Sequence, residues 1–449
     1  MLIAEKIENG LIKALTRPQN YVLKGKVNKV VGLVLESDGP KAPIGEICIL
    51  KDRNGKEVTK TEIVGFKDGR KILSMVLGDL SSISPGMEIE ATGKTLSISV
   101  GDGLLGRIVD GLCNPIDGKG LIRSRETRSI YALPPNPLQR SRITEPIYTR
   151  IRAIDGMLTI GKGQRVGIFS GSGVGKSTLL GMIARNTSAD INVIALIGER
   201  GREVKEFIER DLGEEGLKRS IVVVATSDAP ALVRVKAALV ATTIAESFRD
   251  RGLDVMLMMD SVTRLAMAQR EVGLTIGEPP TTKGYTPSVF STLQKTMERA
   301  GTSTIGSITG LYTVLVEGDD MNEPIADAAR GILDGHIVLS RKLASLGHYP
   351  AIDILESISR VRNDIITPKH KDSASILAEL LATYKIAEDL ISVGAYQKGI
   401  NLKTDKAVAF NDIINMFLMQ KSDEVSEFEE TTESIWSIKE MIDQASLKK

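Results

Sequence analysis

The chain has 449 residues, with 42% apolar and 26% charged side chains, which is ordinary for a soluble globular protein of two to three domains. Its 58 basic and 57 acidic residues leave a formal net charge of +1, which argues against a global field for holding nucleic acid or an anionic membrane. Only 4% of residues are aromatic, which argues against aromatic platforms for stacking the bases of single-stranded nucleic acid. The two distant cysteines do not form a disulfide framework, and the three histidines are too few for a histidine-based metal site.

Residues 1–20 form the first predicted element, a short amphipathic helix that places Leu2, Ile7, Leu11 and Leu15 on one stripe. Such a helix packs on its own domain or docks a partner, and the pattern leaves both open. The acidic residues near the start argue against a signal peptide. No window offers about 20 consecutive apolar residues, as a membrane span needs. We therefore expect a cytoplasmic protein.

Residues 21–97 contain short segments rich in Val and Ile, separated by turn signals with Gly or Pro. Five or six short strands at this spacing predict a small all-β barrel domain. The segments expected as strands are Lys26–Leu35, Glu46–Leu50, Thr59–Phe66, Lys71–Met75 and Met87–Thr92.

Residues 98–369 alternate short apolar runs with helical stretches, which predicts a parallel sheet covered on both faces. The runs are Val166–Phe169, Val193–Ile197, Ile221–Ala225, Val255–Met259 and Tyr312–Val316. Strand signals vanish from about residue 370, and Ser373–Val393 and Lys406–Leu418 carry helical periodicity. Residues 370–449 are therefore expected to form a helical C-terminal domain.

The segment Val166–Leu180 contains a strand, a glycine-rich turn and a helix, the arrangement of a phosphate-binding P-loop. Lys176 supplies a charge for the outer phosphates, and the Ser177 hydroxyl is placed to ligate Mg²⁺. Ser170 departs from the usual pattern, which has Gly six residues before the lysine, so the prediction depends on the strand and helix on either side. The backbone N–H groups of the loop and the start of the helix would surround phosphate oxygens. The nucleotide-binding residues predicted here are Ser170, Gly171, Ser172, Gly173, Val174, Gly175, Lys176, Ser177 and Thr178.

Carboxylates follow two of the predicted strands. Asp254–Asp260 is an apolar run that ends in Asp260, where P-loop NTPases place an Mg²⁺-organising aspartate. Glu199 follows Val193–Ile197 and is the candidate that orients and deprotonates the attacking water, with Arg200 as a neighbouring charge. Each pattern alone is common in buried strands and solvated turns. Together with the phosphate loop they predict an ATP-hydrolysing site.

Nearly the whole chain resembles the family of F1-type rotary ATPase subunits, and within it the flagellar type III protein-export ATPases. The stretch Gly277–Phe290 looks flagellar rather than F1 β and decides the subfamily. The resemblance implies a RecA/F1-like α/β P-loop NTPase core with an N-terminal β-barrel and a C-terminal helical domain. The other segments that carry it are Leu105–Gly118, Thr149–Gly156, Phe169–Ser177, Gly198–Glu203, Asp260–Arg270 and Tyr349–Arg360.

The resemblance also implies residue roles in the hydrolysis of ATP-Mg²⁺. Lys176 and Ser177 match the P-loop lysine and the Mg²⁺ ligand, and Asp260 matches an aspartate that binds Mg²⁺ through water. Glu199 matches the glutamate that activates water. Two arginines, Arg200 and Arg264, match residues on the γ-phosphate side of the site.

Three further residues match positions at the edges of the family's nucleotide site. Tyr349 matches an adenine-stacking tyrosine, and Phe428 matches a second adenine contact. Arg360 matches an arginine finger that reaches the nucleotide of the neighbouring subunit. A finger supplied in trans contributes a rate effect of about 10³–10⁵-fold in related NTPases, so we expect a homohexameric ring to be the active form.

The partners follow from the same resemblance. The N-terminal segment of export ATPases binds a regulatory stator-like protein, which favours the docking role of residues 1–20. A central stalk protein, an export gate, chaperones and flagellar cargo are the other expected partners. Contact with the inner-membrane export apparatus is expected to be peripheral, and no nucleic acid is expected.

Alternative functions come from different classes. A non-catalytic ring subunit like F1 α has Gln at the position of Glu199, so the glutamate argues against it. A virulence type III secretion ATPase shares every catalytic residue, and only residues 277–290 and the genomic neighbourhood separate the two. A hexameric RNA translocase uses the same core, but the low aromatic content and the F1-like barrel disfavour it.

Overall fold

The structure, a computed structural model, describes residues 22–69, 71–316, 318 and 320–447. The predicted helix at residues 1–20 lies outside the described residues. The chain divides after Leu96 into two compact units, which are taken separately below.

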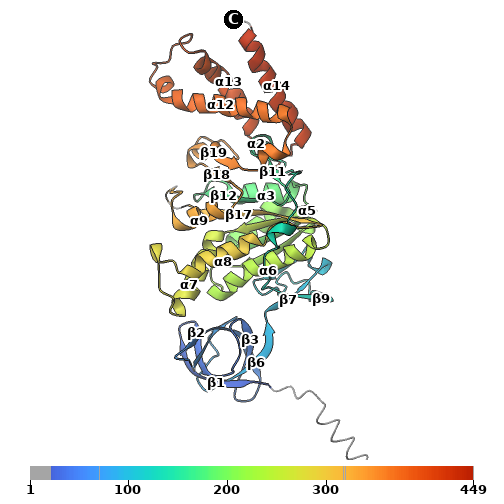
Figure 1. The fold of residues 1–449 in the computed structure, drawn as a ribbon, viewed down its shortest axis with the longest axis vertical. Helices are drawn as coiled ribbons and strands as arrows, with labels where there is room; N and C mark the ends of the chain where they lie inside the picture. The colour runs from blue at the N-terminus through green and yellow to red at the C-terminus, as the bar shows by residue number, and fades with distance from the viewer. Residues whose placement is uncertain (1–21, 70, 317, 319, 448–449) are drawn as a thin grey trace, which may run out of the picture. The chain divides into compact units, whose positions relative to one another are not determined.

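The first unit is a closed barrel of six strands, which confirms the predicted β-barrel (Figure 1). Its strands pair in the order β1-β2-β5-β4-β3-β6, and all neighbours are antiparallel. Fully buried side chains such as Leu35, Leu50, Ile63 and Ile89 fill its interior. The strands are β1 (Lys24–Val31), β2 (Val34–Asp38), β3 (Glu46–Lys51), β4 (Glu57–Lys67), β5 (Lys71–Val76) and β6 (Glu88–Thr95).

One predicted strand of the barrel is wrong. The expected run Lys26–Leu35 is two strands, β1 and β2, joined by a tight turn at Gly32. Gly32 has a φ of 56°, a conformation that glycine adopts without a steric penalty. The residues around it are apolar, so the turn carries none of the polar signals that mark the other turns.

The second unit is built on a nine-stranded sheet in the order β19-β18-β12-β17-β15-β13-β14-β8, with β16 paired to β17. All pairs in it are parallel except β18 with β19 and β16 with β17. The five predicted apolar runs coincide with β12, β13, β14, β15 and β17. The strands of this sheet are β8 (Ile108–Asp110), β12 (Arg165–Ser170), β13 (Ile191–Ile197), β14 (Ser220–Ala225), β15 (Asp254–Asp260), β16 (Gly301–Thr302), β17 (Ser307–Leu315), β18 (Gly335–Leu339) and β19 (Ile352–Ser359).

Helices cover the sheet, and consecutive strand residues serve opposite faces. In β15, Met256 and Met258 join the core cluster that contains α3, whereas the equally buried Leu257 points away from that cluster. Helix α6 packs on β13, β14 and β15. The helices here are α2 (Arg152–Met157), α3 (Lys176–Asn186), α4 (Gly201–Glu206), α5 (Gly213–Lys218), α6 (Ala231–Arg249), α7 (Val262–Thr275), α8 (Pro287–Glu298), α9 (Pro324–Ile332), α10 (Arg341–Ser345) and α11 (Arg362–Ile365). A π-helical turn at Phe207–Leu212 separates α4 from α5, and short strands β7 (Ser97–Val100), β9 (Glu126–Ser129), β10 (Pro146–Ile147) and β11 (Ile160–Gly161) form two small sheets.

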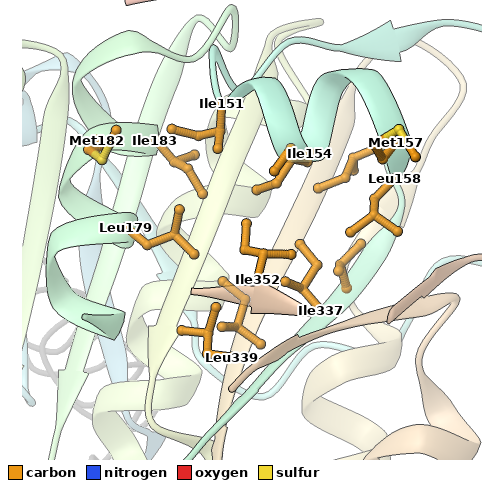
Figure 2. Packing of buried hydrophobic residues seen from close by; sticks show 14 of the residues in the cluster. Ile151, Ile154, Met157, Leu158, Leu179, Met182, Ile183, Ile337, Leu339 and Ile352 are labelled. Atoms are coloured by element: carbon orange, nitrogen blue, oxygen red, sulfur yellow. The ribbon is translucent and has the colours of Figure 1, made fainter. Parts of the chain in front are cut away.

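A continuous apolar core fixes α3 against the edge of the sheet. Figure 2 shows Leu179 and Ile183 of α3 facing Ile154 of α2, Ile337 of β18 and Ile352 of the edge strand β19. Each of these side chains is at most 2% exposed. Because interiors pack at crystal-like density, this core sets where the first turn of α3 lies relative to β18 and β19.

The C-terminal part is helical, as predicted, with α12 (Pro368–Ser392), α13 (Leu402–Leu418) and α14 (Phe428–Leu447). Thr367 begins α12 by accepting a hydrogen bond from the N–H of His370, and Asn401 caps α13 in the same way. The three helices pack against one another and on α2 (Figure 1). Within the described residues, none of the helices combines the length and apolar composition needed to cross a membrane.

Candidate nucleotide site

The predicted phosphate loop follows β12 and leads directly into α3. Gly173 and Gly175 have φ values of 77° and 87°, and Gly175 is the left-handed residue before the helix. A Cβ on Gly171 would lie 2.4 Å from Nε of Arg341, so a side chain at this position would require the Arg341 side chain to shift. Helix α3 begins at Lys176 and runs for 11 residues, so its free N–H groups and positive dipole end face the loop.

Three charged residues predicted for catalysis or metal binding meet where the loop leaves the sheet. Nζ of Lys176 lies 2.5 Å from Oδ1 of Asp260 and 3.9 Å from Oε1 of Glu199. They come together because β12, β13 and β15 are parallel, which brings the carboxyl ends of all three strands to one edge. The Thr313 hydroxyl of β17 donates to Oδ1 of Asp260 at 2.7 Å and orients that carboxylate.

The environment of Glu199 suits a base that works near neutral pH. Burial and, after it, the charge of Asp260 together raise the pKa of Glu199 to about 7, against the opposing effect of Lys176. The 14% exposure of the Glu199 side chain still leaves access for a water molecule. A carboxylate with this pKa exchanges a proton readily at physiological pH.

Three buried polar atoms at the site have no hydrogen-bond partner among the described residues: Oε1 of Glu199, Nε of Arg264 and Oγ of Ser170. Buried polar atoms are rarely left unpaired in native structures, so such a group points to a ligand or bound water. A nucleotide's outer phosphates and the attacking water supply the acceptors and donors that these atoms need.

The residues also fit a magnesium ion held mainly by phosphate and water. The Ser177 hydroxyl and the Asp260 carboxylate are oxygen ligands of the type that Mg²⁺ prefers. No group of three or more His, Cys, Asp or Glu side chains forms a metal cage in the described part of the chain. Mg²⁺ usually keeps several waters and binds through one or two protein oxygens plus substrate phosphates, which matches this sparse ligand set.

The two arginines predicted for the γ-phosphate side lie in different surroundings. Arg264 follows the Ser261 cap of α7 and lines a cavity of about 440 Å³ with Ser170 and Gly171 of the phosphate loop. A Cβ on Gly198 would lie 2.9 Å from Cβ of Arg264, so glycine permits this approach. Arg200 is not brought to the loop in the same chain.

The side chain of Arg200 is 81% exposed and pairs with Glu203 at 3.4 Å. The Arg200 side chain therefore does not line the phosphate-loop cavity of its own chain, and its place on the γ-phosphate side stays a prediction. The physical reason is its position at the start of α4: Gly198 and Glu199 turn the chain out of the sheet, so the next side chain points to solvent.

Tyr349 lies on the other side of the loop. It lines a cavity of about 660 Å³ together with Gly173, Gly175 and Thr178 of the phosphate loop and first turn. A Cβ built on Gly175 would be 3.4 Å from the Tyr349 ring, so loop and ring nearly touch. The ring is 45% exposed, which leaves a face for an aromatic base.

Phe428, predicted as a second adenine contact, does not line this cavity. Its ring stacks on Tyr148, with centroids 4.5 Å apart, at the start of α14. The residues that line the cavity from the C-terminal part are Met419, Gln420, Lys421, Ser422 and Glu424. The sequence did not single out this segment because it is a polar connection with no motif.

Gln420 ties that segment to the site. It is 4% exposed, and its N–H donates to the carbonyl of Tyr349 at 2.9 Å. Its side chain also contacts the backbone of Arg150 and Arg152. The C-terminal helices are therefore fastened to the wall of the Tyr349 cavity.

Arg360 lies apart from the other predicted residues. It follows the end of β19 and is exposed. Strand pairing aligns Ser359 with Gly335 and Gly335 with Val166, at the beginning of β12, whereas the phosphate loop follows the other end of β12. Arg360 and Lys176 therefore lie at opposite edges of the sheet in one chain.

Known proteins share all three parts of this architecture. Residues 150–359 match the nucleotide-binding domain of the ATP synthase alpha/beta family, residues 27–93 match its beta-barrel domain, and residues 366–437 match the T3SS EscN ATPase C-terminal domain. The chain is 55% identical to the flagellum-specific ATP synthase of Bacillus subtilis over 430 residues, which cover 95% of this chain and 98% of that protein. It is 48% identical to the type 3 secretion system ATPase of Sinorhizobium fredii over 415 residues, 92% of each protein. A solved structure of assembled EscN with its central stalk EscO, from enteropathogenic E. coli, matches with a TM-score of 0.85 and 46% identity, covering 92% of this chain and 99% of that one.

Proposed function

The chain belongs to the ATP synthase alpha/beta family and is an ATPase, and we propose that it hydrolyses ATP to support the export of flagellar proteins by a type III apparatus. The observation that carries the proposal is the meeting of Lys176, Asp260 and Glu199 at the phosphate loop. It joins a phosphate-binding cation, a metal-binding carboxylate and a base in one place.

The chemistry of the site follows from these positions. The loop N–H groups and Lys176 bind the outer phosphates of ATP, and Ser177 and Asp260 would hold Mg²⁺. When bound, Mg²⁺ would neutralise charge on the outer phosphates. Glu199 orients the attacking water and accepts its proton, which its pKa of about 7 permits. Arg264 lies close enough to the loop to stabilise charge on the transferred group.

Tyr349 and the first turn of α3 form the base-binding part of the proposed site. The half-exposed ring beside Gly175 provides a stacking face for adenine. Phe428 is not included, because its ring packs on Tyr148 instead.

We propose that the active form is a homohexameric ring in which Arg360 of one copy completes the site of the next. Its exposure at the edge of the sheet away from its own phosphate loop supports a role in trans. Arg200, exposed at the start of α4 on the phosphate-loop edge of the sheet, would act on the γ-phosphate side where a neighbouring copy covers it. The assembled relative EscN supports this arrangement.

The proposed partners are a central stalk protein, as EscN has in EscO, and a regulatory stator-like protein at residues 1–20. Export gate, chaperones and flagellar cargo complete the set, and contact with the inner-membrane apparatus is peripheral and cytoplasmic. A virulence type III secretion ATPase is the second candidate. The 55% identity to a flagellar relative against 48% to a type 3 secretion relative, at similar coverage, favours the flagellar function. An F1-type rotary subunit is a weaker alternative.

A complementation experiment tests the proposal. The full chain is expressed in a bacterium that lacks its flagellar export ATPase, and swimming is scored beside Mg²⁺-dependent phosphate release by the purified protein. We expect wild type to restore swimming and to release phosphate, and Lys176→Ala to do neither. The exposed control Lys218→Ala should behave as wild type. Rescue of virulence-type secretion without rescue of swimming overturns the flagellar assignment.

A further inference from the structure

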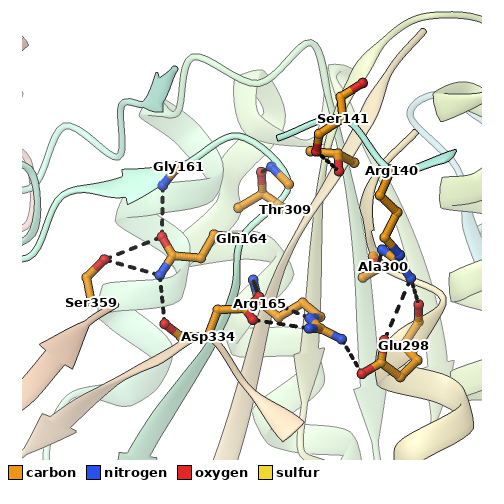
Figure 3. Close-up of polar contacts among 12 residues, drawn as sticks. Arg140, Ser141, Gly161, Gln164, Arg165, Glu298, Ala300, Thr309, Asp334 and Ser359 are labelled. Carbon is orange, nitrogen blue, oxygen red and sulfur yellow. Dashed lines mark hydrogen bonds and ion pairs between the residues drawn. The ribbon is translucent and has the colours of Figure 1, made fainter. Parts of the chain in front are cut away.

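The backbone that leads into Arg360 is held by a buried amide on a different strand. Gln164 stands immediately before β12 and is 0% exposed. Its Nε2 donates to Oγ of Ser359 at 3.1 Å and to the carbonyl of Asp334 at 3.3 Å. Its Oε1 accepts a hydrogen bond from the N–H of Gly161 at 2.9 Å, which fixes the orientation of the amide (Figure 3).

Ser359 is the residue directly before Arg360, and it is held from two sides. Its hydroxyl accepts from Gln164 and donates to the carbonyl of Thr159 at 3.0 Å. The last residue of β19 is thus tied to the segment before β12 as well as to β18.

Asp334 links Gln164 to Arg360 itself. The Asp334 carbonyl that accepts from Gln164 also accepts the N–H of Arg360 at 3.1 Å. Arg165 holds this aspartate by donating to its two carboxylate oxygens at 3.0 and 3.1 Å, and the N–H of Asp334 donates back to the carbonyl of Arg165 at 2.8 Å. Arg165 in turn pairs with Glu298 of α8 at 2.6 Å. The shared acceptor therefore has little freedom to move.

Close packing around Gly335 further restricts movement of the Gln164 amide and of the end of β19. A Cβ on Gly335 would lie 2.6 Å from the carbonyl oxygen of Ile358 and 3.1 Å from Nε2 of Gln164. The glycine lets the start of β18, the end of β19 and the amide approach to a distance that no other residue permits. A buried amide so enclosed has one conformation, and each bond it makes is costly to lose.

From these contacts we propose that Gln164 is a positioning residue for Arg360: its amide fixes the backbone from which the guanidinium reaches the neighbouring copy's nucleotide. The inference rests on the proposed role of Arg360 in trans. The inference adds that β12 serves two nucleotide sites. The residue before its start supports Arg360, which acts on the neighbouring copy's nucleotide, and its end leads into the phosphate loop that binds this chain's own nucleotide. A displacement of about 1 Å in a catalytic group costs on the order of 10²-fold in rate.

The primary test uses Gln164→Met, which keeps the length of the side chain and removes its hydrogen bonds. We expect kcat to fall by about 10- to 100-fold while KM for ATP and the affinity for a fluorescent ATP analogue stay at wild-type values. Asn192→Leu is the matched control, because Asn192 is also a fully buried amide whose Nδ2 makes two hydrogen bonds, at 2.8 and 3.3 Å, but it stands on β13. It should lose comparable thermal stability and keep its kcat. Wild-type kcat in Gln164→Met overturns the proposal.

A mixing experiment separates positioning in trans from a defect in the chain's own site. Gln164→Met keeps an intact phosphate loop, and Lys176→Ala keeps an intact finger, so a mixed ring contains Gln164→Met sites served by sound fingers. We expect the mixture to recover activity that neither variant has alone. If Gln164→Met folds poorly, Ser359→Ala takes its place, because it removes the hydroxyl through which the amide acts.

Arg360→Ala mixed with Lys176→Ala distinguishes the possible failures. If activity recovers in the mixture of Arg360→Ala with Lys176→Ala but not in the mixture with Gln164→Met, the positioning role of Gln164 is overturned and the proposed function stands. No recovery in either mixture removes the finger in trans, and the role of Gln164 falls with it.

Discussion

Nζ of Lys176 lies 2.5 Å from Oδ1 of Asp260, although the two residues are 84 positions apart. The pair joins the phosphate loop to the end of β15 and keeps two mostly buried charges, with side chains 13% and 5% exposed, from being left unpaired. In the proposed site, ATP-Mg²⁺ would give each residue a new partner, phosphate for the lysine and metal for the carboxylate. The substrate would then replace this ion pair, and the first two predictions concern the base beside it.

Glu199→Gln should bind ATP with near wild-type affinity and lose turnover by about 10²–10⁴-fold, because the amide fills the same space and accepts no proton. Binding is measured with a fluorescent ATP analogue and turnover by phosphate release. Glu214→Gln, at an exposed position on α5, is the matched control and should change neither. Near-normal turnover in Glu199→Gln would remove this residue from the role of base.

The activity should depend on pH through Glu199. Its pKa of about 7 means that the carboxylate form, the one that accepts a proton, is lost as pH falls through that value. A plot of kcat/KM, which reports the free enzyme, should fall about tenfold per pH unit on the acid side. Glu203 also raises the pKa of Glu199, so Glu203→Ala should move this limb to lower pH. A profile that stays flat through neutral pH contradicts the assignment.

Arg360→Ala should bind nucleotide normally and fail to show the rise in specific activity that wild type shows as protein concentration increases. The loss at high concentration is expected to be about 10³-fold, the lower value for a finger supplied in trans. Arg210→Ala, on an exposed arginine that pairs with Asp211, serves as the control. If wild-type specific activity does not change with concentration, catalysis does not depend on a ring.

Tyr349→Ala should raise KM for ATP by about tenfold and Tyr349→Phe should not, because aromatic stacking on a base contributes on the order of 1–3 kcal/mol. Phe428→Ala provides the contrast. Its ring packs on Tyr148, so that substitution should lower the melting temperature and leave KM unchanged. A rise in KM for Phe428→Ala would restore its predicted contact with adenine.

The parts of the fold that could be predicted are those with a strong local pattern. The strands β12 to β15 and β17 are buried on both faces and therefore appear as apolar runs, and the glycines of the phosphate loop mark its turn. The edge strands were missed for the opposite reason. In β19 Glu356 and Ile358 are exposed, so the strand shows no run that sequence patterns detect.

The site divides in the same way. Lys176, Glu199 and Asp260 could be predicted because each follows a recognisable strand, and parallel strands bring their ends together. Gln164 and Gln420 could not, since a single buried glutamine in a connection has no pattern of its own. Their importance comes from contacts between segments far apart in the chain, such as Gln164 with Ser359 and Gln420 with Tyr349.

The separation of Arg360 from the phosphate loop has a consequence for counting. Under the proposed role of Arg360 in trans, each head-to-tail contact between copies completes one site, so an open row has one fewer complete sites than copies. One end of the row presents an unused arginine and the other an uncompleted loop. Closing the row into a ring adds one complete site without adding a copy. The maximal activity of an assembly therefore depends on whether the ring is closed as well as on the number of copies.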